Sequence, residues 1–157
     1  MAWMEGSALG HLMRDSGVWM YGIVNLTHIL GVASLFGSIL VLDLRLLGLW
    51  RRIPIAALAG ATVPVATIGF AVAATTGVGL LATKATEYVG NPFLLIKFPA
   101  IALGVLNVAL LKRSTAWRSC ALRELSRAET NQLAIMGGVS LLCWTTAITA
   151  GRMIGYW

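Results

Sequence analysis

Four long apolar runs constrain this chain more than any other feature, because they occupy most of its 157 residues. A transmembrane helix needs about 20 consecutive apolar residues. The runs come close to or exceed that length at residues 18–41, 55–81, 93–111 and 127–154. Hydrophobic residues make up 58% of the chain and charged residues 11%, against roughly 25% charged residues in soluble domains. The sequence therefore predicts an all-α fold, a four-helix transmembrane bundle that forms one membrane domain over residues 1–157.

Residues at the ends of the runs support these boundaries. Trp19 and Tyr21 stand at the start of the first run, and such amphipathic rings are enriched at the membrane interface. Pro92 precedes the third run at a plausible first helical position. Ser126 and Glu129 have the spacing of a capping box, in which each side chain bonds the backbone amide of the other residue. The fourth helix is therefore predicted to begin directly after Ser126.

The segment before the first run has apolar residues at loose helical spacing, which predicts a short helix lying in the membrane interface. A secretory signal needs a basic start and a shorter apolar region. Glu5 and Asp15 are acidic residues where a signal would be basic, and the first apolar run is longer than the apolar region of a signal. We expect the segment to be retained in the mature protein.

The basic residues are distributed unevenly between the two sides of the predicted bundle. Eight of the twelve lysines and arginines fall on one side: Arg45, Arg51, Arg52, Lys112, Arg113, Arg118, Arg123 and Arg127. The other four are Arg14, Lys84, Lys97 and Arg152. Positive residues favour the cytoplasmic side, so both termini are predicted to lie outside, in the periplasm of a bacterial inner membrane. Because the orientation of the helices explains the excess of basic residues, we expect no nucleic-acid partner.

His28 is the most informative polar residue of the first run. It stands nine residues after Trp19, which at 1.5 Å per residue is roughly 14 Å into the membrane. An ionisable side chain at that depth is costly and usually faces the interior of the bundle. Asn25 and Gly31 share its side of the helix, and Asn25, one turn earlier, is placed to orient the imidazole ring.

A histidine facing the interior of a four-helix bundle is a natural axial ligand for a b-type haem. The haem propionates would then point to the outer surface, where Lys97, Arg152 and Lys84 can pair with them. Gly31 and the glycines of the second run would let a flat macrocycle approach the helix backbone. These residues predict a haem b site.

Other interpretations of His28 stay open, because the apolar runs hold no second histidine. The sixth iron ligand would be His11, Met136, Met153, a histidine of another subunit, or none. Alternatively, His28 bonds Asn25, Thr27 or a serine across the bundle and holds helices together. A third interpretation is that His28 contacts a quinone, a proton or a substrate. For Lys97 the alternative is that its side chain only extends to the interface.

Polar residues elsewhere in the runs predict helix contacts. Asp43 and Arg45 near the end of the first run predict an ion-paired helix end, with docking of anionic lipid or of a partner as the alternative. Asn107 and Ser140 favour hydrogen bonds between helices. No hydrolase or nucleotide-binding pattern occurs, so the sequence leaves enzymatic activity undecided.

Two stretches resemble a known family. They are Val24-Asn25-Leu26-Thr27-His28-Ile29-Leu30-Gly31, continuing through Phe36-Gly37-Ser38 to Leu42-Asp43-Leu44-Arg45-Leu46-Leu47-Gly48, and Asn91-Pro92-Phe93-Leu94-x-x-Lys97, together with Thr76-Gly77. The chain resembles a DUF6644-like family of small bacterial four-helix membrane proteins, which implies the fold and no function. More distantly, the His28-x-x-Gly31 helix looks like those of CopD-type and cytochrome b561-like membrane proteins, some of which bind haem.

These observations predict a small multi-pass membrane protein with a haem-binding or redox-linked role as an electron-transfer subunit. One alternative is a non-redox scaffold or accessory subunit, which would dock a larger complex or anionic lipid. Another is a small transporter or channel, if His28, Lys97 and Asn107 line one wet cavity. The expected partners are the lipid bilayer and either a second copy of the chain or a larger membrane complex.

Overall fold

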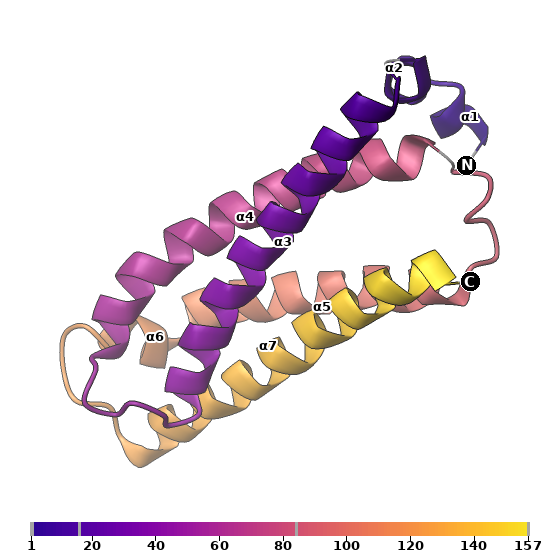
Figure 1. The fold of residues 1–157 in the computed structure, drawn as a ribbon. Helices are drawn as coiled ribbons and strands as arrows, with labels where there is room; N and C mark the ends of the chain where they lie inside the picture. Colours follow the sequence, from indigo (N-terminus) through magenta and orange to yellow (C-terminus); the bar gives the residue numbers. More distant parts are fainter. Residues whose placement is uncertain (1, 16, 84, 157) are drawn as a thin grey trace. The chain divides into compact units, whose positions relative to one another are not determined.

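The computed structural model describes residues 2–15, 17–83 and 85–156, and helices account for most of them (Figure 1). In chain order the helices are α1 (Ala2–Glu5), α2 (Ala8–Asp15), α3 (Gly17–Leu46), α4 (Ile55–Thr83), α5 (Pro92–Arg113), α6 (Thr115–Ser119) and α7 (Arg127–Met153), followed by a 3₁₀ turn, η1 (Ile154–Tyr156). No strand occurs among the residues described. The all-α prediction is confirmed.

Four of these helices are long and apolar enough to cross a membrane, as the sequence predicts. The spanning segments are Trp19–Leu46, Ile55–Thr83, Pro92–Arg113 and Arg127–Tyr156. By length and composition the chain is therefore a multi-pass membrane protein. The position of both termini outside the cytoplasm stays a prediction.

The first long helix extends further than predicted, to Leu46 rather than residue 41. The prediction stopped at residue 41, shortly before the polar residues Asp43 and Arg45. Both polar side chains find partners inside the fold, so they do not interrupt the helix. The helix ends just before Gly48, whose φ of +107° belongs to the left-handed region that favours glycine.

The residues group into two compact units. Unit 1 comprises Met1–Phe36 and Val65–Asn91, and unit 2 comprises Gly37–Pro64 and Pro92–Trp157. The chain passes between the units at three points: within α3, within α4, and directly before α5 at Asn91 and Pro92.

In unit 1 the predicted N-terminal helix is split into α1 and α2. Ser7 explains the break, because its hydroxyl donates to the carbonyl of Met4 (2.6 Å) and accepts from the amide of Gly10 (3.2 Å). The segment is attached to the connection after α4, since Glu5 Oε2 accepts from the amide (2.9 Å) and the hydroxyl (2.5 Å) of Thr86.

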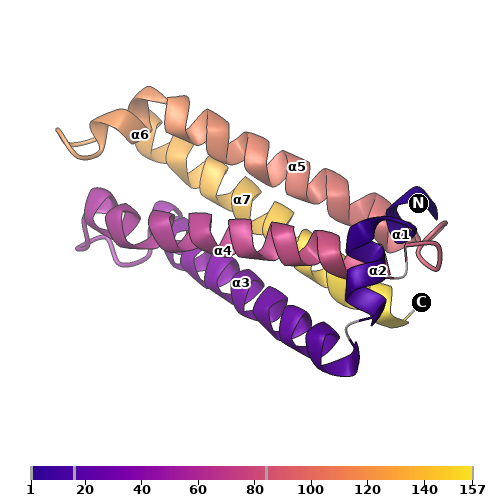
Figure 2. The ribbon, with the colours of Figure 1, turned by 90° about the horizontal axis from the view of Figure 1, so that it is seen from above.

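In unit 2, α5 and α7 lie side by side over most of their length (Figures 1 and 2). Gly104 allows this close packing, because a Cβ there would lie 3.1 Å from the indole ring of Trp144. An apolar cluster lies near the end of α5 and the start of α7. It consists of Leu46, Leu111, Ala116 and Leu133, with Ile55, Trp117, Leu125 and Met136 around it. Burial of these side chains holds α3, α5, α6 and α7 together in this unit.

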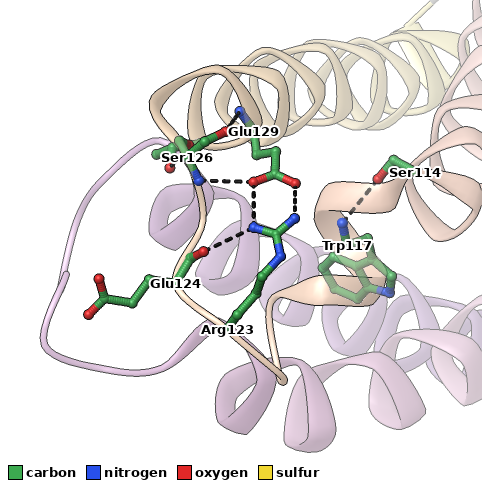
Figure 3. A network of polar contacts seen from close by, with 7 residues as sticks. Ser114, Trp117, Arg123, Glu124, Ser126 and Glu129 are labelled. Carbon is green, nitrogen blue, oxygen red and sulfur yellow. Dashed lines mark hydrogen bonds and ion pairs between the residues drawn. The ribbon is translucent and has the colours of Figure 1, made fainter.

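The predicted capping box at the start of α7 is present (Figure 3). The Ser126 hydroxyl accepts from the amide of Glu129 (3.2 Å), and Glu129 Oε2 accepts from the amide of Ser126 (2.9 Å). Arg123 adds a two-pronged ion pair, donating to both carboxylate oxygens of Glu129 at 2.9 and 2.6 Å. The hydrogen bond to Glu129 raises the pKa of the Arg123 guanidinium above its ordinary value, so this group stays charged at any physiological pH.

Candidate functional site

The candidate site in unit 1 is built on a close contact between α3 and α4. Small residues follow one another every fourth position on α4, at Gly69, Ala73 and Gly77, which places them on one face of the helix. A Cβ on Gly31 of α3 would lie 2.9 Å from the backbone nitrogen of Ala73. A Cβ on Gly69 would lie 2.6 Å from the backbone nitrogen of Leu35 and 2.8 Å from the carbonyl oxygen of Gly31. The two helix backbones therefore touch at Gly31 and Gly69.

His28 is half-buried one turn before Gly31, and its partner is Thr76 of α4. Its Nδ1 lies 3.0 Å from the hydroxyl oxygen of Thr76. Gly77 makes room for the ring, because a Cβ there would lie 3.1 Å from Cε1 of His28. The imidazole is thus fixed against α4 by one hydrogen bond and one glycine.

The hydrogen bonds of Thr76 favour one position of the proton on the neutral ring. The Thr76 hydroxyl donates to the carbonyl of Val72 at 2.6 Å. A hydroxyl has one proton to donate, so toward His28 it acts as the acceptor, and Nδ1 of His28 carries the hydrogen. The neutral imidazole then bears its lone pair on Nε2.

Asn25 and His11 take no part in this contact. Asn25 is half-buried on α3 and makes no hydrogen bond to His28 in the part of the chain that the structure describes. Thr76 therefore has the orienting role that the sequence gave to Asn25. His11 lies exposed on α2, where its backbone amide donates to the carbonyl of Ser7 (3.0 Å).

Gly31 has a different role from the one predicted. The sequence suggested that Gly31 and the glycines of α4 leave space for a flat macrocycle, but at Gly31 and Gly69 that space holds the backbone of the facing helix. That part of the prediction is wrong. A ring bound to His28 would have to lie on a side of α3 other than this contact.

The predicted outer cations Lys97 and Arg152 both belong to unit 2. Lys97 is half-buried on α5 and lies along Gly151 of α7, where a Cβ would come within 3.4 Å of its Nζ. Arg152, the next residue, is exposed; it donates to the hydroxyl of Tyr156, and its guanidinium lies 4.7 Å from the centre of that ring. The structure thus brings Lys97 beside the residue that precedes Arg152. Lys84 lies outside the described residues.

The two predicted methionine ligands are also in unit 2. Met136 is half-buried at the edge of the apolar cluster there, and its backbone carbonyl accepts from the side-chain amide of Asn107 (2.9 Å). Met153 is 38% exposed at the end of α7. The predicted helix-packing role of Asn107 is confirmed.

The ion pair predicted between Asp43 and Arg45 is wrong. Arg45 instead donates to two backbone carbonyls of the α3–α4 connection, those of Ile53 (2.6 Å) and Arg51 (3.2 Å). Ser140 of α7 hydrogen-bonds the carboxyl group of Asp43. The two residues point to different partners because side chains two positions apart on a helix do not face each other.

Sequence reasoning missed Thr76 as the partner of His28, and the reason is the distance between them along the chain, 48 residues. A signal was available, because small residues at every fourth position of an apolar helix mark a helix contact. The adjacent Thr76 then lies at the edge of that face. The family resemblance drew attention to Thr76-Gly77 without giving it a partner.

Comparison with known proteins gives one match. The model of a family of unknown function, DUF6644, matches residues 1–157, which is the whole chain. Neither a curated protein nor a solved structure matches. The likeness of the His28 helix to CopD-type and cytochrome b561-like proteins rests on the sequence alone.

Proposed function

The chain belongs to the DUF6644 family, and from this premise we propose that it is a b-type haem-binding membrane subunit for electron transfer, in which His28 would hold the iron. The observation that carries the proposal is the hydrogen-bond chain from His28 through Thr76 to Val72. Histidines that bind metals nearly always donate their other ring N–H to a neighbouring group, which fixes the tautomer and the ring orientation. Thr76 supplies such a group for His28.

The residues present in unit 1 fit this role. Neutral His28 with its proton on Nδ1 carries its lone pair on Nε2, which is the form that binds iron. Haem needs only one or two ligands from the protein, so the absence of a cluster of three metal-binding side chains among the described residues does not bear on it. When bound, the group would supply one-electron redox chemistry.

A second candidate is a non-redox scaffold or accessory subunit, and the close contact at Gly31 and Gly69 favours it. A hydrogen bond to a threonine on a touching helix is a sufficient explanation for a half-buried histidine in this position. In this case His28 stabilises the α3–α4 pair, and the protein acts through contacts with a larger membrane complex. For either candidate we propose the bacterial inner membrane as the location.

An absorption spectrum separates the two candidates. The wild type, His28→Ala and His11→Ala are expressed in haem-replete cells, purified in detergent, and measured oxidised and after reduction with dithionite. We expect a Soret band and sharpened reduced α and β bands in the wild type and their loss in His28→Ala. If His11 is not the sixth ligand, His11→Ala, which changes an exposed histidine, keeps the wild-type spectrum.

A colourless, folded wild type from haem-replete cells would reject the haem proposal and leave the scaffold candidate in first place. Thr76→Val provides a further test, because it removes the group that orients His28 without removing the ligand. A haem protein should then keep its Soret band and change its reduction potential. A protein in which His28 only joins helices would show a change in stability alone.

A further inference from the structure

Unit 2 contains a second polar centre, which is independent of His28. Three of its buried side chains are polar and come from three long helices: Asp43 of α3, Asn107 of α5 and Ser140 of α7. They are 4%, 7% and 4% exposed. Asn107 has its partner in the carbonyl of Met136. Asp43 is the acidic residue among the three, and buried acidic residues in a membrane helix usually have a function.

The carboxyl group of Asp43 is only partly satisfied. Ser140 hydrogen-bonds it, but Oδ2 has no hydrogen-bond partner among the described residues. The surroundings are closely packed, because a Cβ on Gly137 of α7 would lie 3.2 Å from the carbonyl oxygen of Asp43 and 3.1 Å from Cβ of Leu46. A buried oxygen without a partner is uncommon in folded proteins and calls for an explanation.

No cation of the described part of unit 2 is bonded to Asp43. Arg45 of the same helix binds the carbonyls of residues 51 and 53 instead, and α4 contains no charged residue. The other titratable or charged groups on the long helices and α6 of this unit are Lys97, Lys112 and Arg113 of α5, Arg118 of α6, and Arg127, Glu129, Cys143 and Arg152 of α7. None of these has a described bond to Asp43 either.

We propose that Asp43 is a proton-exchange site, at which Oδ2 binds a proton from water and releases it again. An O–H bond forms at Oδ2 as a hydronium ion or a water gives up its proton, and the reverse step returns the proton to solvent. Binding a proton changes the charge of a buried carboxyl without requiring a neighbouring cation. Asp43 is three residues from the end of α3, or about 4.5 Å along the helix axis, so the path to water is short.

Infrared spectroscopy tests the proposal directly, because protonated and ionised carboxyl groups absorb at different frequencies. The chain has two aspartates, Asp15 and Asp43, so Asp15→Asn protein grown with ¹³C-labelled aspartate has Asp43 as its sole labelled carboxyl. Full-length protein in detergent is titrated with pH. We expect one isotope-shifted band of a protonated carboxyl that is exchanged for a carboxylate band as the pH rises.

Two variants make the assignment specific. Adding Asp43→Asn should remove both labelled bands, and Ser140→Ala should shift the midpoint of the titration, because it removes the hydrogen bond to the carboxyl group. Asn107→Leu, which changes another buried polar residue of unit 2, one that bonds Met136, serves as the matched control. Its midpoint should stay at that of the wild type.

Chemical labelling gives a second measurement that does not depend on the variants folding. Dicyclohexylcarbodiimide is apolar and reacts with protonated carboxyl groups, which transfer their proton to its nitrogen while the carboxyl oxygen adds to its central carbon. We expect one adduct on the peptide containing Asp43, with a yield that depends on pH. A labelled carboxyl that stays in one form over the whole accessible pH range, with no adduct at Asp43, would overturn the proposal.

Discussion

At the scale of single residues, one hydroxyl group determines the chemistry of His28. Thr76 donates its proton to Val72 and so favours the neutral imidazole with its proton on Nδ1. The imidazole ring packs against Gly77, where a side chain would lie too close to Cε1 of His28. The same geometry therefore serves a metal ligand or a contact between helices, and the tautomer can be tested by itself.

We expect His28 to be in the Nδ1–H tautomer in the wild type and to lose that preference in Thr76→Val. The chain has two histidines, so His11→Gln protein with ¹⁵N-labelled histidine gives the NMR signals of His28 alone. Thr75→Val is the control, because the neighbouring Thr75 is exposed and bonds only its own helix. Thr76→Val should also lower the unfolding free energy by about 0.6 kcal/mol, the mean for hydrogen bonds between membrane helices. Equal effects of the two variants would contradict this assignment.

Cys120, in the connection before α7, should react slowly with thiol reagents. Burial raises the pKa of its thiol, and its Sγ donates to the carbonyl of Trp117 (3.0 Å). Because the thiolate is the nucleophile, a raised pKa leaves less of it at neutral pH. In Cys143→Ser protein, the rate of maleimide alkylation should lie below that of a small peptide thiol and should rise at a higher pH. A rate equal to that of the peptide would show that Cys120 is unprotected.

At the scale of helices, glycine positions decide which faces can approach. On α4, Gly69 meets the backbone of α3, whereas a Cβ on Gly60 would have no neighbouring atom within 4 Å. The same contrast exists on α3 between Gly31 and Gly22. Glycines of the same helix can therefore differ greatly in how much a change to alanine would destabilise the protein.

Gly69→Ala should destabilise the protein by about 1–3 kcal/mol, because the new Cβ would overlap backbone atoms that cannot move aside easily. Gly60→Ala on the same helix should be neutral or stabilising by up to about 1 kcal/mol, since alanine favours helix more than glycine does. Unfolding in a denaturing detergent, followed by circular dichroism, measures both variants. A neutral Gly69→Ala would mean that α3 and α4 do not touch at this position.

The helices themselves could be predicted because their signals are local. Run length gave the four spans, and the spacing of Ser126 and Glu129 gave the start of α7. The site could be predicted only in part, because its contacts join distant segments: Thr76 to His28 in unit 1 and Ser140 to Asp43 in unit 2. The end of α3 was missed for the same reason, since the partner that lets the helix continue through Asp43 belongs to α7.

At the scale of the whole molecule, the distribution of charge predicts the orientation in the membrane. Single cysteines at Ala2, Thr115 and Gly155, all exposed positions, test it in a chain without Cys120 and Cys143. A membrane-impermeant maleimide should label Ala2→Cys and Gly155→Cys in intact spheroplasts and Thr115→Cys only after permeabilisation, because basic connections stay in the cytoplasm. The reverse pattern would place both termini inside the cell.

Arginines at the end of α3 and within the connection donate hydrogen bonds to the carbonyl groups of the connection between α3 and α4. Arg45 binds the carbonyls of residues 51 and 53, and Arg51 binds that of Gly48 (3.2 Å). A peptide tag inserted there would separate donors from acceptors and should lower the yield of folded protein. The connection before α7 offers a better place, since Leu122 is 85% exposed and exposed loop tips tolerate insertion. Affinity tags and fluorescent reporters placed beside Leu122 should therefore leave the assembly of this membrane protein intact.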